Sequence, residues 1–165
     1  MDRQQKIIIF VMAALLLVAL VVMVVVLCGR EAPAAPEFDP PSFDEAAISG
    51  LPTDVPEELN YGSPSTQGEF KFSLCGTPEV TEDNRLRIYF TSPATNKVWL
   101  LIKIYDTEGA LIGESGLLRP DEYVEHVQLE REVARGSDIV IKVLSYEVDT
   151  YYSKGTIQGA LKIAE

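Results

Sequence analysis

The chain carries two hydrophobic patterns that differ in length and period. Residues 7–28 form an unbroken apolar run without a charged, amide or proline residue. At about 1.5 Å per residue, a helix of this length spans roughly 33 Å, which matches a bilayer core of about 30 Å. From Glu69 onward the apolar residues recur at every second position, which is typical of half-buried β-strands. We therefore predict one transmembrane helix followed by a β-rich domain.

The flanks of the apolar run predict its orientation. Arg3 and Lys6 precede the run, whereas Arg30 is the only basic residue between the run and Lys71. Basic residues are retained on the cytoplasmic side of a membrane helix, so residues 1–6 should form a cytoplasmic tail. We accordingly predict a single-pass protein of the cell membrane with an extracellular C-terminal domain.

Two other interpretations of the N-terminus remain open. A cleaved signal peptide would end at a small-residue site such as Ala-Pro-Ala at 32–34, although its apolar region is usually about 7–15 residues long. Lipid attachment at Cys28 would need a small residue just before the cysteine, and Leu27 occupies that position. The length of the run agrees best with an uncleaved anchor.

Residues 29–67 are rich in proline and in acidic side chains. Eight acidic residues against one arginine give this segment a charge of −7 within a chain of net charge −11. With few large apolar side chains, the segment cannot bury enough surface to offset the entropy of ordering it. We predict a disordered, extended linker over 29–67. Its acidity also argues against a nucleic-acid partner, which would require clustered lysine and arginine.

The alternating pattern predicts about seven strands. The clearest is 98–105, where both faces are apolar enough for a central strand. Asp106–Gly109 is typical of a tight hairpin turn, with Gly109 at its positive-φ position. The other strands are expected around 70–74, 86–91, 110–114, 123–129, 139–146 and 157–163. Because no long amphipathic helix interrupts them, we predict an all-β, antiparallel sandwich over 68–165.

Three turn segments carry a resemblance to a known group of proteins. They are TSPATN at 91–96, GALIGESG at 109–116 and LRPDEYVE at 118–125. Together with the layout of the chain, they resemble small membrane-anchored proteins of Gram-positive bacteria, in which a helix and an acidic linker precede one immunoglobulin-like sandwich. The chain differs at Ser92 and Asp121, where the group tends to have Asn and Gly. The resemblance implies an immunoglobulin-like fold in the cell envelope, and it carries over no catalytic residue because the group has no assigned activity.

Candidate catalytic and metal-binding residues are sparse. His126 is the only histidine, and alternation places it on the solvent face of its strand with Val124 and Gln128. No G-x-S-x-G elbow occurs. Cys75 is the only thiol of the domain and is expected to be unpaired and partly buried. One histidine and two cysteines cannot supply the usual four ligands of zinc. We predict that the protein is not an enzyme and holds no cofactor or metal.

Aromatic side chains offer the most distinctive candidate site. Trp99, Tyr89 and Tyr105 alternate away from the strongest apolar rows, and Tyr151 and Tyr152 lie in an expected loop. Such side chains either form an interaction face or cover the second face of a central strand. We expect a non-catalytic envelope protein that contacts the bilayer through 7–28 and an unidentified envelope protein through its sandwich. The alternative is a carbohydrate-binding module for cell-wall or host glycans, which requires an exposed Trp99.

Overall fold

The chain divides into two units, Met1–Asp39 and Pro40–Glu165, and each is described by itself. The computed structural model describes residues 2–28, 38–62, 65–66 and 70–165. Within these ranges, the side chains outside the description are those of 6–8, 11, 13, 24–28 and 65–66. The first unit contains a single described element, the helix α1 (Arg3–Cys28).

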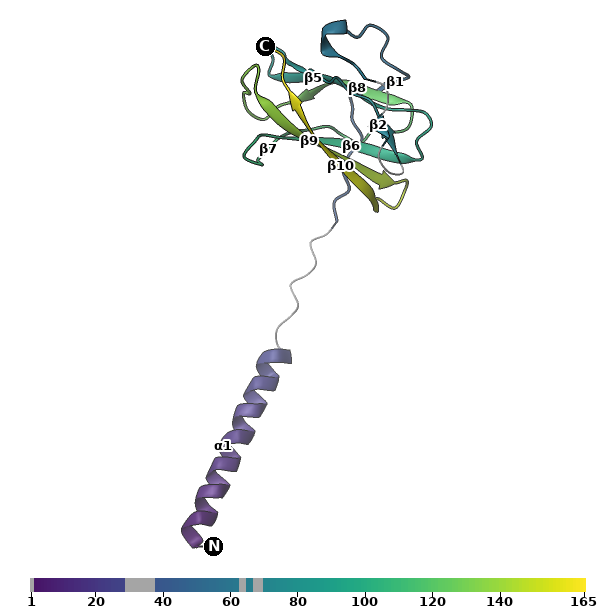
Figure 1. The fold of residues 1–165 in the computed structure, drawn as a ribbon. Coiled ribbons are helices and arrows are strands. Elements are labelled where there is room, and N and C mark those ends of the chain that lie inside the picture. Colours follow the sequence, from purple (N-terminus) through teal and green to yellow (C-terminus); the bar gives the residue numbers. More distant parts are fainter. Residues whose placement is uncertain (1, 29–37, 63–64, 67–69) are drawn as a thin grey trace. The chain divides into compact units, whose positions relative to one another are not determined.

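Helix α1 includes the whole apolar run 7–28 (Figure 1). Among the described residues, no helix combines the length and the hydrophobicity that crossing a membrane requires. The transmembrane role of this run stays a prediction. The part of the predicted linker at 29–37 lies outside the described residues.

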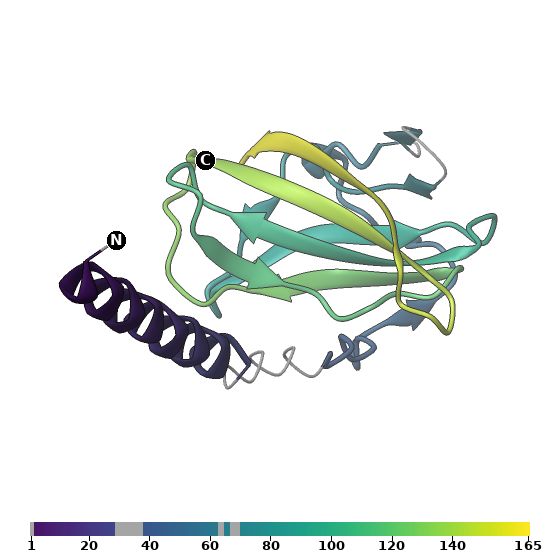
Figure 2. The same ribbon diagram turned by 90° about the horizontal axis from the view of Figure 1, so that it is seen from below.

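Two four-stranded antiparallel sheets form the second unit (Figures 1 and 2). Sheet I has the strand order β1-β8-β5-β4, and sheet II has the order β10-β9-β6-β7. The strands of sheet I are β1 (Ile48–Ser49), β8 (Glu122–Gln128), β5 (Arg85–Ser92) and β4 (Glu79–Val80). Those of sheet II are β10 (Ser153–Lys162), β9 (Asp138–Glu147), β6 (Val98–Tyr105) and β7 (Leu111–Glu114). A short ladder joins β2 (Ser65–Thr66) to β3 (Lys71–Phe72), and η1 (Glu57–Leu59) is a 3₁₀ turn. The all-β, two-sheet architecture agrees with the prediction.

The main core lies between the inner faces of the two sheets. Leu86, Ile88 and Phe90 of β5 are fully buried there, as are Leu100 and Ile102 of β6. Strand β6 has the bounds predicted from its alternation. The hairpin turn after β6 is also as predicted: the Gly109 N–H donates to the Asp106 carbonyl over 3.2 Å, and Gly109 has a φ of 86°.

A β-bulge interrupts the pairing of β5 with β8. Ile88 and Tyr89 both lie opposite Glu125, and Tyr89 has a φ of 49°. The extra residue lies in β5, so β8 spans the same stretch with one residue fewer, and the alternation of its side chains changes between Val124 and Val127. Val124 is consequently buried in the core, although strict alternation predicts that it shares the solvent face with His126.

The predicted linker and domain boundary at 67 is displaced in the structure. The compact unit begins at Pro40, and β1 pairs with β8. Phe43 forms a parallel bridge with Leu117, and Leu59 is 1% exposed. The composition of 40–62 resembles a linker because its apolar residues are few. Two of them, Phe43 and Leu59, nevertheless pack against the outer faces of the sheets.

Candidate functional site

Trp99, the centre of the predicted aromatic face, lies on the outer face of sheet II and is covered. Its side chain is only 9% exposed. Phe43 packs edge-on against it with ring centroids 4.9 Å apart, and the Tyr151 ring lies 5.1 Å away. The Arg119 guanidinium stands 3.6 Å from the centre of the Phe43 ring. Trp99 therefore belongs to a second apolar cluster, which Phe43 covers from outside the sheet.

The other predicted aromatics do not join one surface. Tyr105 is six residues further along β6, about 20 Å from Trp99, and Lys142 Nζ lies 4.6 Å from its ring centre. Tyr152 is 72% exposed. Tyr89 lies on β5 in the other sheet. The structure thus brings Trp99 and Tyr151 together and separates both from Tyr89.

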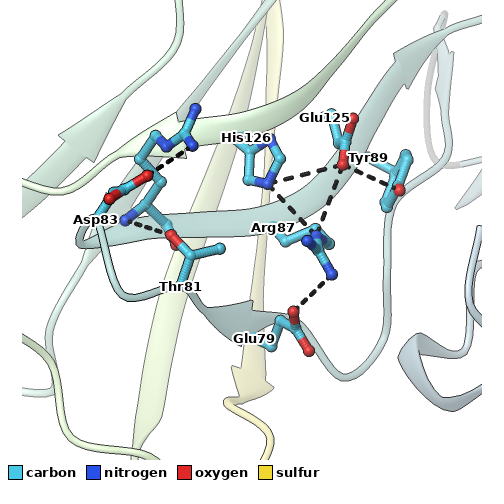
Figure 3. A network of polar contacts seen from close by, with 8 residues as sticks. Glu79, Thr81, Asp83, Arg87, Tyr89, Glu125 and His126 are labelled. Atoms are coloured by element: carbon cyan, nitrogen blue, oxygen red, sulfur yellow. Dashed lines mark hydrogen bonds and ion pairs between the residues drawn. The ribbon is translucent and has the colours of Figure 1, made fainter.

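On sheet I, several charged and polar side chains among the described residues form a connected network (Figure 3). Arg87 lies at its centre, with its Nη1 2.7 Å from a Glu79 carboxylate oxygen and its Nε 3.6 Å from Glu125. The strands position these groups, because Arg87 is opposite Glu79 on β4 and opposite His126 on β8. The sequence alone does not reveal this network, because Glu125 and His126 come near the same arginine through a bulge in the pairing of β5 with β8.

His126 takes part in the network as a hydrogen-bond acceptor. Arg87 Nε donates to His126 Nε2 over 3.4 Å. Burial lowers the pKa of His126, Glu125 opposes that effect, and the positive charges of Arg85 and Arg87 add to it. His126 is consequently favoured in its neutral form, with Nε2 unprotonated toward Arg87. The side chain is 19% exposed.

Tyr89 and Cys75 connect the network to a third apolar cluster. The Tyr89 hydroxyl donates to Glu125 over 3.2 Å, and its ring packs with Leu59 and Cys75. Burial raises the pKa of Tyr89, and the Glu125 charge adds to this. Burial also raises the pKa of Cys75 to about 12. At neutral pH the thiol stays protonated, so Cys75 is unsuited to nucleophilic chemistry. The structure describes it as a free, buried cysteine.

One cavity places a serine near His126 and Glu125. It has a volume of about 400 Å³, and its lining includes Ser115, Glu125 and His126. The Ser115 hydroxyl, however, donates to the Gly116 carbonyl over 2.8 Å and accepts the Ile102 N–H over 3.1 Å. Through these two bonds, the hydroxyl attaches the segment after β7 to β6. Ser115 therefore acts as a structural hydroxyl rather than as a nucleophile activated by a base.

The network consists of one arginine paired with two carboxylates, beside a neutral histidine. Among the described residues, no group of three or more His, Cys, Asp or Glu side chains is placed to hold a metal ion. The network ties β4, β5 and β8 together at the surface of sheet I. Comparisons of the chain with protein-family models, with curated proteins and with solved structures find no match.

Proposed function

We propose that this protein is a non-catalytic, membrane-anchored envelope protein that presents its sandwich to a protein partner. The anchor is residues 7–28, with the tail on the cytoplasmic side and the sandwich outside. The apolar sequence of this run supports that part of the proposal, together with its helical conformation in α1. An acidic, proline-bearing segment then separates the sandwich from the bilayer.

The observation that carries the interaction role is the unequal length of the sheet edges. Strands β1 and β4, at the edges of sheet I, have two residues each. Strand β7, at one edge of sheet II, has four residues, and Gly113 within it forms a further bridge with Leu129. Strand β10, at the other edge, has ten residues. Long open edges promote pairing with other chains, so β10 is the best-suited contact region of the described sandwich.

The glycan alternative receives no support from the arrangement of the aromatics. Sugar stacking requires flat aromatic side chains exposed in one plane. Phe43 covers Trp99, and Tyr89 lies on the opposite sheet. We therefore favour protein contact over carbohydrate binding.

Site-specific crosslinking in native cells tests the interaction role. A photoreactive residue replaces Gln158 of β10, and a matched control replaces Glu82 in the turn between β4 and β5; both positions are exposed. We expect a discrete crosslinked product of the full-length protein from position 158 and none from position 82. Identical products from both positions, or none from position 158, would contradict the proposal.

Protease accessibility tests the topology separately. In cells freed of their wall, added protease should digest the sandwich while a cytoplasmic marker stays intact. A sandwich that is digested only after lysis would place it on the cytoplasmic side and rule out the envelope role.

A further inference from the structure

We propose that the outer edge of β10 binds an extended segment of its partner in which acidic and aliphatic residues alternate. This inference rests on the proposed function and specifies the chemistry of the partner. The bound segment would extend sheet II by one strand, so the backbone of β10 supplies hydrogen bonds and its side chains supply selectivity.

The backbone groups available for this pairing follow from the register of β9 and β10. The Ile163 N–H donates to the Ser137 carbonyl over 3.0 Å, one step beyond the pair Lys162↔Asp138. In an antiparallel ladder, residues turn their backbone groups alternately toward and away from the neighbouring strand. A register shift interrupts the pairing between Ser153 and Gly155, and from Gly155 onward the odd-numbered residues of β10 bond to β9. The backbone groups that point to the open edge are those of Thr156, Gln158, Ala160 and Lys162.

The central strand of the same sheet gives an independent check on this alternation. Leu100 of β6 lies opposite Ser145 of β9. Its N–H nevertheless donates to the Leu118 carbonyl, on the side away from β9. The register pairs Leu101 with Leu144 and Ile157 with Val143. The backbone groups of the even-numbered β6 residues consequently point away from β9. The odd-numbered β9 residues that lie opposite them point their backbone groups away from β6, toward β10. These odd-numbered β9 residues pair with odd-numbered β10 residues, so the backbone groups of the even-numbered β10 residues point to the outer edge.

The side chains of β10 separate into an apolar row and a polar row. Ile157 and Leu161 are partly buried and pack at the border of the main core. Aliphatic side chains on an added strand would cover the exposed parts of these two residues. On the opposite face, Thr156, Gln158 and Lys162 are exposed. The alternation of β10 thus calls for a partner strand with one apolar face.

Charge specifies the other face of the partner strand. Strand β10 contains Lys154 and Lys162 and no acidic residue, in a chain of net charge −11. Lys142 of β9 lies opposite Gln158 and adds a further positive charge near the middle of the edge. Glu147 binds Lys154 over 3.0 Å and Asp138 faces Lys162, but both acids belong to β9, behind the edge. Acidic side chains on the added strand would complement this basic row.

The same lysines disfavour a second copy of this chain as the occupant. Two copies that pair antiparallel along the full length of β10 are related by an axis near Gln158. Lys154 of one copy then lies opposite Lys162 of the other at both ends. Like charges that face each other across a ladder are destabilising.

Titration of the full-length protein in detergent micelles with synthetic peptides tests the inference. The probe is a labelled ten-residue peptide of alternating glutamate and valine. The controls are a lysine–valine peptide and a glutamate–valine peptide with the valines in one block. Fluorescence anisotropy measures binding, and site-resolved hydrogen exchange follows the backbone amides of β10. Without peptide, the amides of residues 156, 158, 160 and 162 should exchange fast and those of 157, 159 and 161 slowly.

We expect the alternating acidic peptide to bind at least about tenfold more tightly than either control and to slow exchange at Thr156, Gln158, Ala160 and Lys162. Gln158→Pro should abolish binding, because the outward N–H is lost while the bonds to β9 remain. Gln158→Ala is its matched control and should bind normally. Lys162→Glu should weaken binding of the acidic peptide and strengthen that of the lysine peptide.

Several outcomes would overturn the inference. Equal binding of the acidic and lysine peptides would remove the charge argument, and binding without protection of the four amides would place the site elsewhere. Concentration-dependent protection without peptide would make a second copy the occupant. If position 158 still crosslinks in cells while the peptide fails to bind, the proposed function stands and only the partner chemistry is rejected. Loss of the crosslink as well would reject both.

Discussion

His126 shows how one side chain connects the network on sheet I to pH. Its Nε2 accepts a hydrogen bond from Arg87, so a proton on that nitrogen would oppose the Arg87 Nε–H. The titratable groups around it are Glu79, Arg85, Arg87 and Glu125. Burial lowers the pKa of His126, and this makes the folded state a poorer proton acceptor than the unfolded chain.

We predict that the unfolding free energy decreases as the pH falls below 6.5. In the unfolded chain His126 binds a proton near its ordinary pKa of 6.5, whereas in the folded domain it stays neutral to lower pH. The unfolded state then holds more protons, which favours unfolding. Denaturant titrations of wild type and His126→Gln across this interval measure the effect. The difference between the two proteins should change with pH, and a constant difference would contradict the role of His126.

Leu59 and Leu51 form a matched pair for a second test. Both lie in the stretch whose composition predicts a linker, but Leu59 is 1% exposed and Leu51 is 63% exposed. Leu59 packs with Cys75 and Tyr89 on the outer face of sheet I. We expect Leu59→Ala to lower the unfolding free energy by about 2–5 kcal/mol and Leu51→Ala to change it by no more than about 0.5 kcal/mol. Equal effects in denaturant titrations would show that this segment does not pack as described.

Single-residue features were the hardest to predict from the sequence. The hairpin residue Gly109 follows a local rule, since its positive φ is set by the turn itself. Tyr89 has a positive φ for a different reason, because a bulge forms only where two strands meet. No pattern within β5 alone contains that information. The grouping of Arg87, Glu125 and His126 depends on the same bulge and was missed for the same reason.

Among the elements, the segment after Pro40 is attached by a small set of backbone bonds. The Asp44 N–H donates to the Leu117 carbonyl over 3.0 Å, and the Leu117 N–H donates to the Ser42 carbonyl over 2.9 Å. The Asp44 carboxylate accepts the Gly116 N–H over 2.8 Å. We refer to this contact of residues 42–44 with residues 115–117 as the N-terminal clasp. It requires glycine at 116, because a Cβ there would overlap the backbone of Asp44.

We predict that Gly116→Ala opens the N-terminal clasp and lowers the unfolding free energy by about 1–3 kcal/mol. Phe43 would then leave Trp99, the only tryptophan of the chain. Acrylamide quenching of tryptophan fluorescence in the folded protein should increase. Gly62→Ala is the control, since among the described residues its Cβ would meet only the Leu74 carbonyl oxygen, 4.0 Å away. Unchanged quenching in Gly116→Ala would mean that the clasp does not hold Phe43 in place.

The elements with strong alternation were predicted well, and those held by a few contacts were not. Strand β6 was predictable because both its faces are apolar, and it contributes to two clusters. Both residues of strand β1 are exposed, and the strand forms only through its pairing with β8. Local composition cannot reveal an element whose stability comes entirely from a partner distant in sequence.

For the molecule as a whole, the period of two was sufficient to predict an all-β fold with two antiparallel sheets. The position of the domain boundary was not predictable from that period. The compact unit starts at Pro40 because residues 43 and 59 cover apolar patches outside the main core. A boundary drawn at 68 would leave Trp99 and Tyr89 without these contacts.

We predict that a fragment of residues 40–165 unfolds cooperatively and that a fragment of residues 68–165 does not. The shorter fragment lacks both Phe43 and Leu59 and exposes the apolar outer faces of both sheets. The unfolding free energy lost with these contacts is expected to approach the total stability of a small domain, which is about 5–15 kcal/mol. Thermal unfolding followed by circular dichroism compares the two fragments. A cooperative transition of equal midpoint in both would place the boundary at 68 after all.

The N-terminal clasp also determines how the sandwich would respond to a pulling force. If the chain is tethered through its N-terminus and held by a partner at β10, tension enters at residues 42–44 and passes to Leu117 and Leu118. Leu118 exchanges two backbone bonds with Leu100 of β6, and the force then crosses β9 to reach β10. While the clasp is closed, this load reaches β10 through sheet II. Rupture under tension would accordingly begin at the few bonds of the clasp.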